Sequence, residues 1–292
     1  MKASKILENL TMYYRVAHRF VFRNQMILDN CWRKTEKGKV NLHWWMIPPT
    51  KNSPPQINVG DYLSYVIVEW MKEQNGIHTD DSFDGKTHHL YALGSIIVTG
   101  FHDATIWGSG ALRLNQFWWR KIRKLDIRSV RGPVTQAGMS ENGYDCPQIY
   151  GDPAILMPLI YTPADRTPKE DYVFIPNHAV ESGAVHELST ITSDYKAFID
   201  RIAQAKLVIS SSLHGIILAE AYGVPAILLR NDALSLLKYQ DYYQSTGRDT
   251  FPVATSVEEA LTMTPPATPE LAQMQKNVMA AFPKDLWLGP EQ

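Results

Sequence analysis

The stretch from residue 207 to residue 229 constrains the fold more than any other part of the chain. It starts with an apolar, partly β-branched run at 207–210, which predicts a buried strand. A helix is expected at 213–222, with Gly223 as its C-cap, and a second apolar strand at 224–229. Two strands joined by a helix make a unit whose strands run parallel. The sequence therefore predicts an α/β fold.

The same alternation extends over most of the chain. Apolar residues at helical spacing predict a helix at 61–73, and another is expected at 193–205 with Ser193 as its N-cap. Arg131 is expected to begin a helix that has Pro133 in its first turn, where proline is tolerated. Strands are expected at 93–99, 105–107, 126–130, 148–150 and 172–175. Together these elements predict two Rossmann-like domains with doubly wound parallel sheets that face a cleft.

A polar connector with two prolines, at 162–168, divides these elements into two blocks. The length of 292 residues suits about two domains. We therefore expect an N-terminal domain at 1–161 and a C-terminal domain at 169–264. The remaining segment, 265–292, is expected to form helices that pack back on the N-terminal domain.

Composition excludes several classes of protein. The 29 basic and 30 acidic residues give a net charge of −1, whereas nucleic-acid-binding proteins usually carry a strong basic excess. The longest run without a charged residue, 87–102, is shorter than the ~20 apolar residues of a membrane-spanning helix. Two distant cysteines, Cys31 and Cys146, predict neither a disulfide framework nor a metal site. The N-terminal residues do not resemble a signal peptide, so a cytoplasmic location is expected.

Two segments on the N-terminal side join glycines to polar side chains near expected strand or helix ends. In the first, 58–61, Gly60 permits tight backbone geometry, and Asp61 either caps the helix or faces the cleft as a base. In the second, the N–H groups of Gly108, Ser109 and Gly110 are candidates to bind a phosphate or sugar oxygen, with a plain glycine turn as the alternative. A third glycine at the spacing of a dinucleotide fingerprint is absent.

Two further segments place polar residues where a strand passes into a helix. Arg131 is expected to point toward an anion at the start of its helix. Beside His214 in the other segment, the hydroxyl and N–H groups of Ser210, Ser211, Ser212 and Gly215 form a candidate anion cradle. His214 falls in the first helical turn, where it can exchange a proton with a bound phosphate. A purely structural histidine is the alternative.

The order of these segments resembles the polysaccharide pyruvyl transferase family, most closely its ketal pyruvate transferases of bacterial exopolysaccharide and capsule synthesis. The motifs that carry the resemblance are Ser-Leu-His-Gly followed by Ala-Glu-Ala-Tyr-Gly-Val-Pro, together with Ile-Trp-Gly-Ser-Gly, Val-Arg-Gly-Pro-Val-Thr, Tyr-Gly-Asp-Pro-Ala and Asn-Val-Gly-Asp. The resemblance implies a GT-B-like arrangement of the two domains. It also implies phosphoenolpyruvate as donor, a lipid-linked oligosaccharide as acceptor, and no further cofactor.

The chain departs from the family pattern at two places. Many members carry an arginine two residues before the motif histidine, where this chain has Ser212. The cation for the phosphate must then come from elsewhere, and Arg131 and Arg230 are the candidates. A family Pro-His segment is similar to residues 175–178, but Asn177 is inserted before His178, the expected substrate-binding residue.

Formation of a pyruvate ketal requires a proton donor to carbon 3, a base for the sugar hydroxyls, and positive charge near phosphate and carboxylate. His214 is the expected acid, with phosphate anchoring as its other role. Asp61 or Asp152 is the expected base, although Asp152 also suits a turn before Pro153. Holding the donor and the diol together in an interdomain cleft is expected to supply much of the rate enhancement.

Three alternatives stay open on the sequence alone. A glycosyltransferase of the same architecture would use a nucleotide sugar, with Glu220 as the candidate ribose ligand. A non-catalytic carbohydrate-binding homologue would explain the missing arginine at position 212. Residues 12–23 and 117–124 combine aromatic and basic side chains, which suits either a helix on the domain surface or peripheral contact with the inner face of the cytoplasmic membrane.

Overall fold

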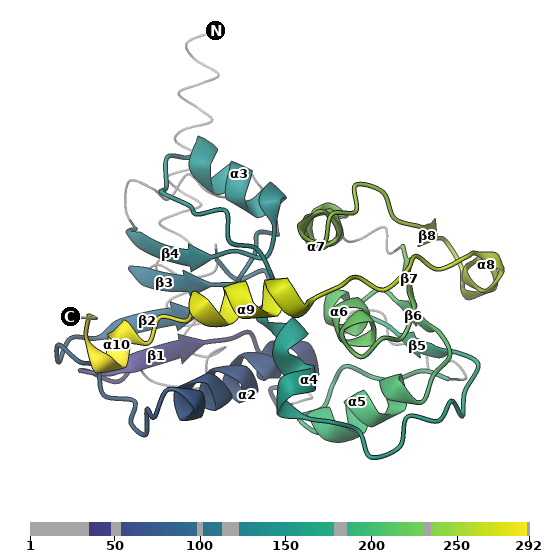
Figure 1. Cartoon of the computed structure of the whole chain (residues 1–292), viewed down its shortest axis with the longest axis horizontal. Helices are drawn as coiled ribbons and strands as arrows, with labels where there is room; N and C mark the ends of the chain where they lie inside the picture. The colour runs from purple at the N-terminus through teal and green to yellow at the C-terminus, as the bar shows by residue number, and fades with distance from the viewer. Residues whose placement is uncertain are drawn as a thin grey trace, which may run out of the picture.

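Two four-stranded parallel sheets form the framework of the chain, with strand orders β1-β2-β3-β4 and β5-β6-β7-β8 (Figure 1). The computed structural model describes residues 35–47, 54–97, 102–112, 123–177, 186–230 and 235–290. The α/β class with parallel strands, predicted from sequence, is confirmed.

The first sheet is covered by a helix on each face. Its strands are β1 (Val40–His43), β2 (His88–Tyr91), β3 (Ala104–Trp107) and β4 (Leu125–Ser129), and its helices are α2 (Val59–Gln74) and α3 (Pro133–Glu141). Leu90 belongs to the same buried cluster as Leu63 and Ile67 of α2, whereas Tyr91 belongs to a second cluster with Met139 of α3. Because successive strand residues point to opposite faces, α2 and α3 lie on opposite sides of this sheet.

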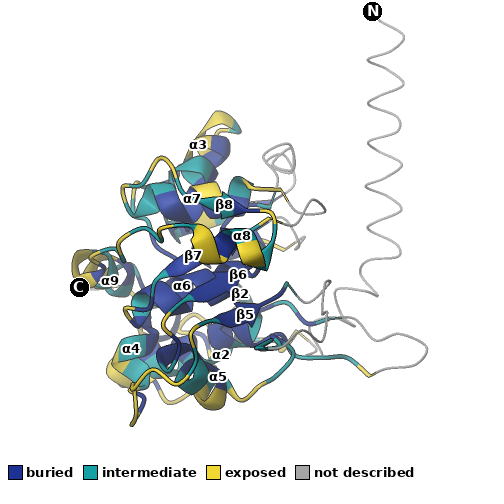
Figure 2. Ribbon diagram, turned by 90° about the vertical axis from the view of Figure 1, so that its right-hand side faces the viewer, coloured by how far each residue is buried: buried dark blue, intermediate teal, exposed yellow. Residues whose placement is uncertain are grey.

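The second sheet repeats this pattern with shorter strands. It contains β5 (Val173–Ile175), β6 (Val208–Ser210), β7 (Ala226–Leu229) and β8 (Val253–Ala254), and four helices follow its strands: α5 (Tyr195–Ala203), α6 (Leu213–Ala221), α7 (Leu237–Ser245) and α8 (Val257–Thr262). Strands β5 and β6 are buried along their whole length (Figure 2). Continuous burial is typical of parallel strands with helices on both faces.

The C-terminal segment returns to the first sheet, as the sequence predicted. Helices α9 (Ala272–Ala280) and α10 (Asp285–Leu288) run across the front of that sheet (Figure 1). The indole of Trp107 in β3 donates a 2.8 Å hydrogen bond to the carbonyl of Val278. Arg128 in β4 forms an ion pair with Asp285 at 2.7 Å. Both contacts fix the segment to the first sheet.

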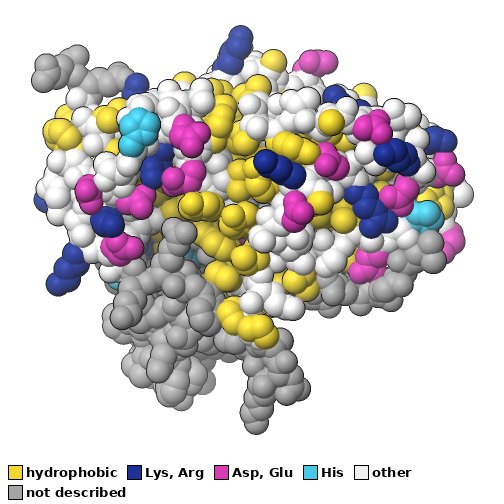
Figure 3. All heavy atoms as spheres, turned by 90° about the horizontal axis from the view of Figure 1, so that it is seen from below, with side chains coloured by type: hydrophobic (Ala, Val, Ile, Leu, Met, Phe, Trp, Pro, Cys, Tyr) yellow, Lys and Arg dark blue, Asp and Glu magenta, His cyan; other side chains and the backbone are white. Residues whose placement is uncertain are grey.

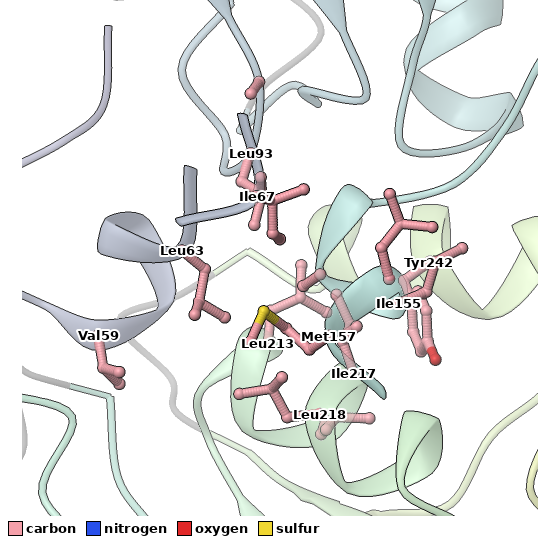
Figure 4. Close-up of a cluster of buried hydrophobic side chains, with 14 of the residues drawn as sticks. Val59, Leu63, Ile67, Leu93, Ile155, Met157, Leu213, Ile217, Leu218 and Tyr242 are labelled. Carbon is pink, nitrogen blue, oxygen red and sulfur yellow. The ribbon is translucent and has the colours of Figure 1, made fainter. Parts of the chain in front are cut away.

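One apolar core connects the two sheets. Residues of α2, α4 (Met157–Ile160) and α6 meet in it, including Leu63, Met157, Leu213 and Ile217 (Figure 4). A band of hydrophobic side chains also crosses the middle of the face seen from below, with charged side chains on either side (Figure 3). This packing brings the N-termini of α2 and α6 together.

Three local predictions were wrong. No strand forms at 92–97, because the chain turns at Gly94, which has φ +85° and whose carbonyl accepts hydrogen bonds from Ser109 and Gly110. Residues 148–150 contribute only an isolated bridge between Val130 and Tyr150. Asp194, rather than Ser193, caps α5 by accepting from Ala197 N. The predicted domain boundaries stay predictions.

Candidate functional site

Asp61 lies in the first turn of α2, but the helix is capped by Asn58. The side-chain oxygen of Asn58 accepts hydrogen bonds from the N–H groups of Gly60 and Asp61, at 3.0 and 3.4 Å. The N-cap alternative for Asp61 is therefore wrong. Its carboxylate faces Gly94, where a Cβ would lie 2.9 Å from Oδ1.

The turn between β6 and α6 is built by serine hydroxyls. Ser210 Oγ lies 2.9 Å from the carbonyls of Ile175 and Ser212 and accepts from Ser212 N. Ser211 Oγ accepts from Asn177 N at 2.8 Å. Gly215 is required because a Cβ there would meet Ser210 Oγ at 2.5 Å. The hydroxyls of Ser210 and Ser211 thus hold the turn, and their predicted role in binding an anion stays a prediction.

The remaining polar groups of this turn stay available for a ligand. Ser212 is the N-cap residue of α6, and no side chain caps the helix. The first N–H groups of an uncapped helix have no intrahelical acceptor and favour anions. The backbone N–H groups at the start of α6 are therefore candidates to bind an anion.

His214 meets the first sheet at the N-terminus of α2. Its imidazole lies against Gly60, and its Nε2 is 3.6 Å from Asp152 Oδ2. The side chain is 12% exposed. Both Nε2 and Asp152 Oδ2 are buried atoms with no hydrogen-bond partner in the structure as described. Unsatisfied buried polar atoms are rare in native proteins, and two that face each other mark a place where a ligand would complete the network.

Asp152 stabilises a turn, which is one of the two roles that the sequence left as alternatives, and its predicted role as a base stays a prediction. Its Oδ1 accepts from Ala154 N at 3.1 Å and caps η2 (Pro153–Leu156), so it does stabilise the turn. Its Oδ2 is the atom that faces His214. The side chain is fully enclosed.

Burial changes the ionisation of Asp61, which lies near His214, and of Lys238, which lies near Asp61. Burial raises the pKa of Asp61 to about 6, opposed by the nearby charges of His214 and Lys238. Burial, together with the charge of Arg131, lowers the pKa of Lys238 to about 8. Groups with pKa values near neutrality can donate or accept protons efficiently at physiological pH.

Lys238 is a site residue that the sequence analysis missed. It lies in the first turn of α7 and is buried, and its Nζ lies over the Tyr239 ring at 4.8 Å. A lysine in the first turn of a helix opposes the helix dipole. The burial of this lysine, which singles it out, is visible only in the structure.

Arg131 does not face a ligand, which corrects its predicted orientation. Its guanidinium is fully buried and bonded to Asp241 Oδ2 at 3.0 Å, Ser95 Oγ at 2.8 Å and the carbonyl of Ala111 at 2.8 Å. Asp241 also accepts from both N and Oγ1 of Thr135. Arg131 therefore connects the first sheet to α7 through Asp241, and no local sequence pattern indicates this pairing.

The Gly-Ser-Gly segment is a packed turn, which is the alternative the sequence left open. The N–H groups of Gly108 and Gly110 donate to the carbonyls of Ser129 and Gly94. Ser109 Oγ donates to the carbonyl of Gly94 at 2.8 Å. A Cβ at Gly108 would meet Pro153 at 2.2 Å, and one at Gly110 would meet the Arg131 guanidinium at 2.3 Å. These glycines serve close packing, which corrects their prediction as phosphate ligands.

Two predicted residues are not brought to His214 by any described contact. Arg230 is exposed directly after β7, and its N–H donates to the carbonyl of Ala254. His178 lies outside the described residues. Their predicted roles stay predictions.

Residues 56–233 match the model of one protein family, polysaccharide pyruvyl transferase. The chain belongs to this family. Membership indicates a transferase that moves pyruvyl groups onto polysaccharide. An uncharacterized protein of Acanthamoeba polyphaga mimivirus is 26% identical over 232 residues, which cover 73% of this chain and 77% of the viral protein.

A crystal structure of a functionally uncharacterized protein from Klebsiella pneumoniae subsp. pneumoniae NTUH-K2044 is similar to this pyruvyl transferase family member. It has a TM-score of 0.49 and 15% identity, covering 79% of this chain and 93% of the Klebsiella chain.

Within the described ranges, no helix is both long and apolar enough to cross a membrane. Histidine, cysteine and carboxylate side chains likewise form no metal-binding group in that part of the chain.

Proposed function

We propose that this pyruvyl transferase moves pyruvate from phosphoenolpyruvate onto two hydroxyls of one sugar in a bacterial surface polysaccharide repeat unit, forming a ketal and releasing phosphate. One observation carries the proposal: the imidazole of His214 meets Asp152 and Gly60 with its Nε2 unsatisfied, beside an uncapped helix N-terminus. An anion binder and a proton donor thus lie side by side.

The reaction balances without a redox partner. One hydroxyl oxygen bonds to carbon 2 of phosphoenolpyruvate while carbon 3 accepts a proton and becomes a methyl group. The bond from carbon 2 to the phosphate oxygen then breaks, and the second hydroxyl oxygen bonds to carbon 2. Two hydroxyl protons are lost in total, matched by the proton on carbon 3 and one that leaves on phosphate or a base.

The described residues supply groups for each step. In this proposal, N–H groups at the start of α6 bind the phosphate, and His214 protonates carbon 3. Asp61 accepts a hydroxyl proton, for which a pKa of about 6 leaves it ionised at neutral pH. Asp152 orients His214 through Oδ2 and is the alternative base.

The site lies where the two sheets share one core, and a GT-B-like arrangement with the donor between two Rossmann-like domains agrees with that position. The proposed acceptor is a lipid-linked oligosaccharide at the inner face of the cytoplasmic membrane. Residues 12–23 and 117–122, for which the sequence left a surface helix and a membrane contact as alternatives, lie outside the described residues. Arg123 is buried, so it does not contribute to such a surface, whereas Lys124 is exposed.

A nucleotide-sugar glycosyltransferase is less well supported. Glu220, its candidate ribose ligand, is buried and bonded to both terminal nitrogens of Arg248 and to the Tyr242 hydroxyl, each at 2.7 Å. This carboxylate is buried against Arg248 and Tyr242 and is therefore not exposed to a ribose. A non-catalytic carbohydrate-binding homologue would bind the acceptor without releasing phosphate from phosphoenolpyruvate, so phosphate release separates it from the proposed transferase.

Thermal unfolding with candidate donors separates these functions. A ligand that binds only the folded state raises the melting temperature, and the rise grows with the logarithm of its concentration once that exceeds the dissociation constant. We expect stabilisation by phosphoenolpyruvate and none by nucleotide sugars or nucleoside diphosphates. Stabilisation by nucleotides alone would contradict the proposal.

The reaction itself is tested with the acceptor. Lipid-linked oligosaccharide from the host, incubated with phosphoenolpyruvate, should release phosphate in equal amount to the ketal formed. Mass spectrometry of the polysaccharide from a strain lacking the gene should show each repeat lighter by pyruvic acid minus one water. An unchanged polysaccharide would rule the proposed acceptor out.

A further inference from the structure

Two contacts fix the start of α7, one to the turn before α6 and one to Arg131 of the first sheet. The Tyr239 hydroxyl donates a 2.7 Å hydrogen bond to the carbonyl of Ser211, in the turn before α6. Asp241, one turn further, forms the buried ion pair with Arg131. Lys238 lies on the same turn, so the contacts of Tyr239 and Asp241 also fix the position of its backbone.

Lys238 is held in an environment that disfavours its charge. Only 8% of the residue is exposed, and it stands at the positive end of α7. The charge of Arg131 lowers the pKa of Lys238, whereas Asp61 raises it. Over the described ranges, the structure shows no ion pair or hydrogen bond to its Nζ. Its Nζ lies over the Tyr239 ring at 4.8 Å, and because buried charges are normally paired, an anionic ligand would stabilise the charged form of this lysine.

The other candidate cations for the donor phosphate are bonded elsewhere or exposed. Position 212 holds a serine, and the guanidinium of Arg131 is bonded to Asp241, Ser95 and Ala111. Arg230 is exposed at the end of β7. The ammonium of Lys238 lies over the Tyr239 ring, and the hydroxyl of that ring is bonded to the carbonyl of Ser211 just before α6, so Lys238 is the described cation best placed to face an anion at the start of α6.

We infer that Lys238 binds the phosphate group of the donor substrate and supplies the charge that an arginine at position 212 would provide. This inference rests on the proposed function. The ammonium and the N–H groups at the start of α6 then approach the phosphate from different elements. Donor binding would give this buried ammonium an anionic partner.

Calorimetric titration with phosphoenolpyruvate tests the inference. In Lys238→Met the dissociation constant should rise about tenfold or more, as expected for the loss of one charged hydrogen bond. Lys238→Arg keeps the charge and should bind within a few-fold of the wild type. Lys206→Met is the matched control, because Lys206 is an exposed lysine paired only with Asp171, and it should bind normally. Titration with inorganic phosphate should show the same order.

Two further measurements separate ligand binding from a structural role. Without ligand, Lys238→Met should melt no lower than the wild type, because it removes an unpaired buried charge. Wild-type affinity should also fall as the pH rises above about 8, the value to which burial brings the pKa of Lys238, and Lys238→Arg should abolish this fall. The charged groups that face this ammonium are Asp61 of α2 and Arg131 beside α3.

The outcomes distinguish the inference from the proposed function. If the wild type does not bind phosphoenolpyruvate, the proposed function fails. If the wild type binds it and Lys238→Met binds equally well, the inference fails and the function stands. Equal loss of binding and of melting temperature in both Lys238 variants would assign the lysine to folding and overturn the inference.

Discussion

The imidazole of His214 rests directly on the backbone of Gly60, so close that a Cβ at position 60 would lie 2.2 Å from Nδ1. Gly60 belongs to the first turn of α2 and His214 to the first turn of α6, so the contact joins two helices that follow strands of different sheets. The glycine is needed because the imidazole occupies the space of a side chain. The position of the proposed acid thus depends on a residue with no functional group.

Gly60→Ala should therefore displace the His214 imidazole. Alanine favours a helix over glycine by about 1 kcal/mol, but overpacking costs about 1–3 kcal/mol, so we expect a net loss of stability and of activity. Denaturant unfolding and phosphate release measure the two effects. The double variant Gly60→Ala/His214→Ala should recover most of the lost stability, because the clash is gone. A Gly60→Ala variant with normal stability and turnover would disprove the contact.

Replacing His214 should abolish turnover more than donor binding. If the imidazole protonates carbon 3, His214→Ala should lower the turnover rate about 10²–10⁴-fold while phosphoenolpyruvate still binds. A loss of binding of similar size would instead assign His214 to phosphate anchoring. His78→Ala is the matched control, since His78 is exposed beyond the end of α2. Near-normal turnover in His214→Ala would remove this histidine from the mechanism.

Asp61 should make stability and activity respond oppositely to pH. Its pKa rises from 3.8 to about 6 on folding, so its protonated form favours the folded state. This contribution is complete below about pH 4 and is lost as the pH rises through about 6. Asn at this position stays neutral. The difference in melting temperature between Asp61→Asn and the wild type should therefore shift in favour of the variant as the pH rises from about 4 to about 6.

Activity should rise over the same range if Asp61 is the base, because only the ionised carboxylate accepts a proton. The kcat/KM of the wild type should show an acidic limb near pH 6. Asp61→Asn should lose most activity, and its remaining activity should lack that limb. The same limb in the variant would assign the ionisation to another group.

The buried pair of Arg131 and Asp241 should be a major contribution to stability. Both side chains are fully enclosed, so removing one leaves an unpaired buried charge that costs about 3–5 kcal/mol. We expect losses of this size in urea unfolding for Arg131→Met and for Asp241→Leu, and a smaller loss in the double variant than in their sum. Lys206→Met, which breaks an exposed pair, should leave unfolding unchanged. Additive losses would show that the two side chains do not interact.

The sequence predicted the parts of the fold that local patterns determine. The helix at 61–73 appears as α2 and the strand–helix–strand unit after residue 207 as β6, α6 and β7, because apolar periodicity and capping residues lie within each segment. The expected strand at 93–99 failed within the described range, since the apolar residues there pack as a turn around Gly94. Apolar content alone does not distinguish a strand from a buried turn.

Candidate site residues could be predicted only where a reactive side chain and the local motif that positions it lie in the same short segment. His214, Asp61 and Asp152 could be found because each stands at the start of a helical turn. The partner of Arg131 is Asp241, 110 positions away, and the pairing depends on how α7 packs beside α3. Lys238 reads as an ordinary helical lysine until the burial of that turn is known. Such long-range contacts leave no periodic signal.

The hydrogen bond from Trp107 to Val278 spans 171 positions in the chain. At a synthesis rate of about 5–20 residues per second, the ribosome completes Val278 roughly 10–30 s after Trp107. Throughout that interval the nascent first sheet exposes a large indole on a surface destined for α9. Strand β3 is therefore synthesised well before the residues of α9 that cover its indole. During this period a chaperone would protect the growing chain from aggregation.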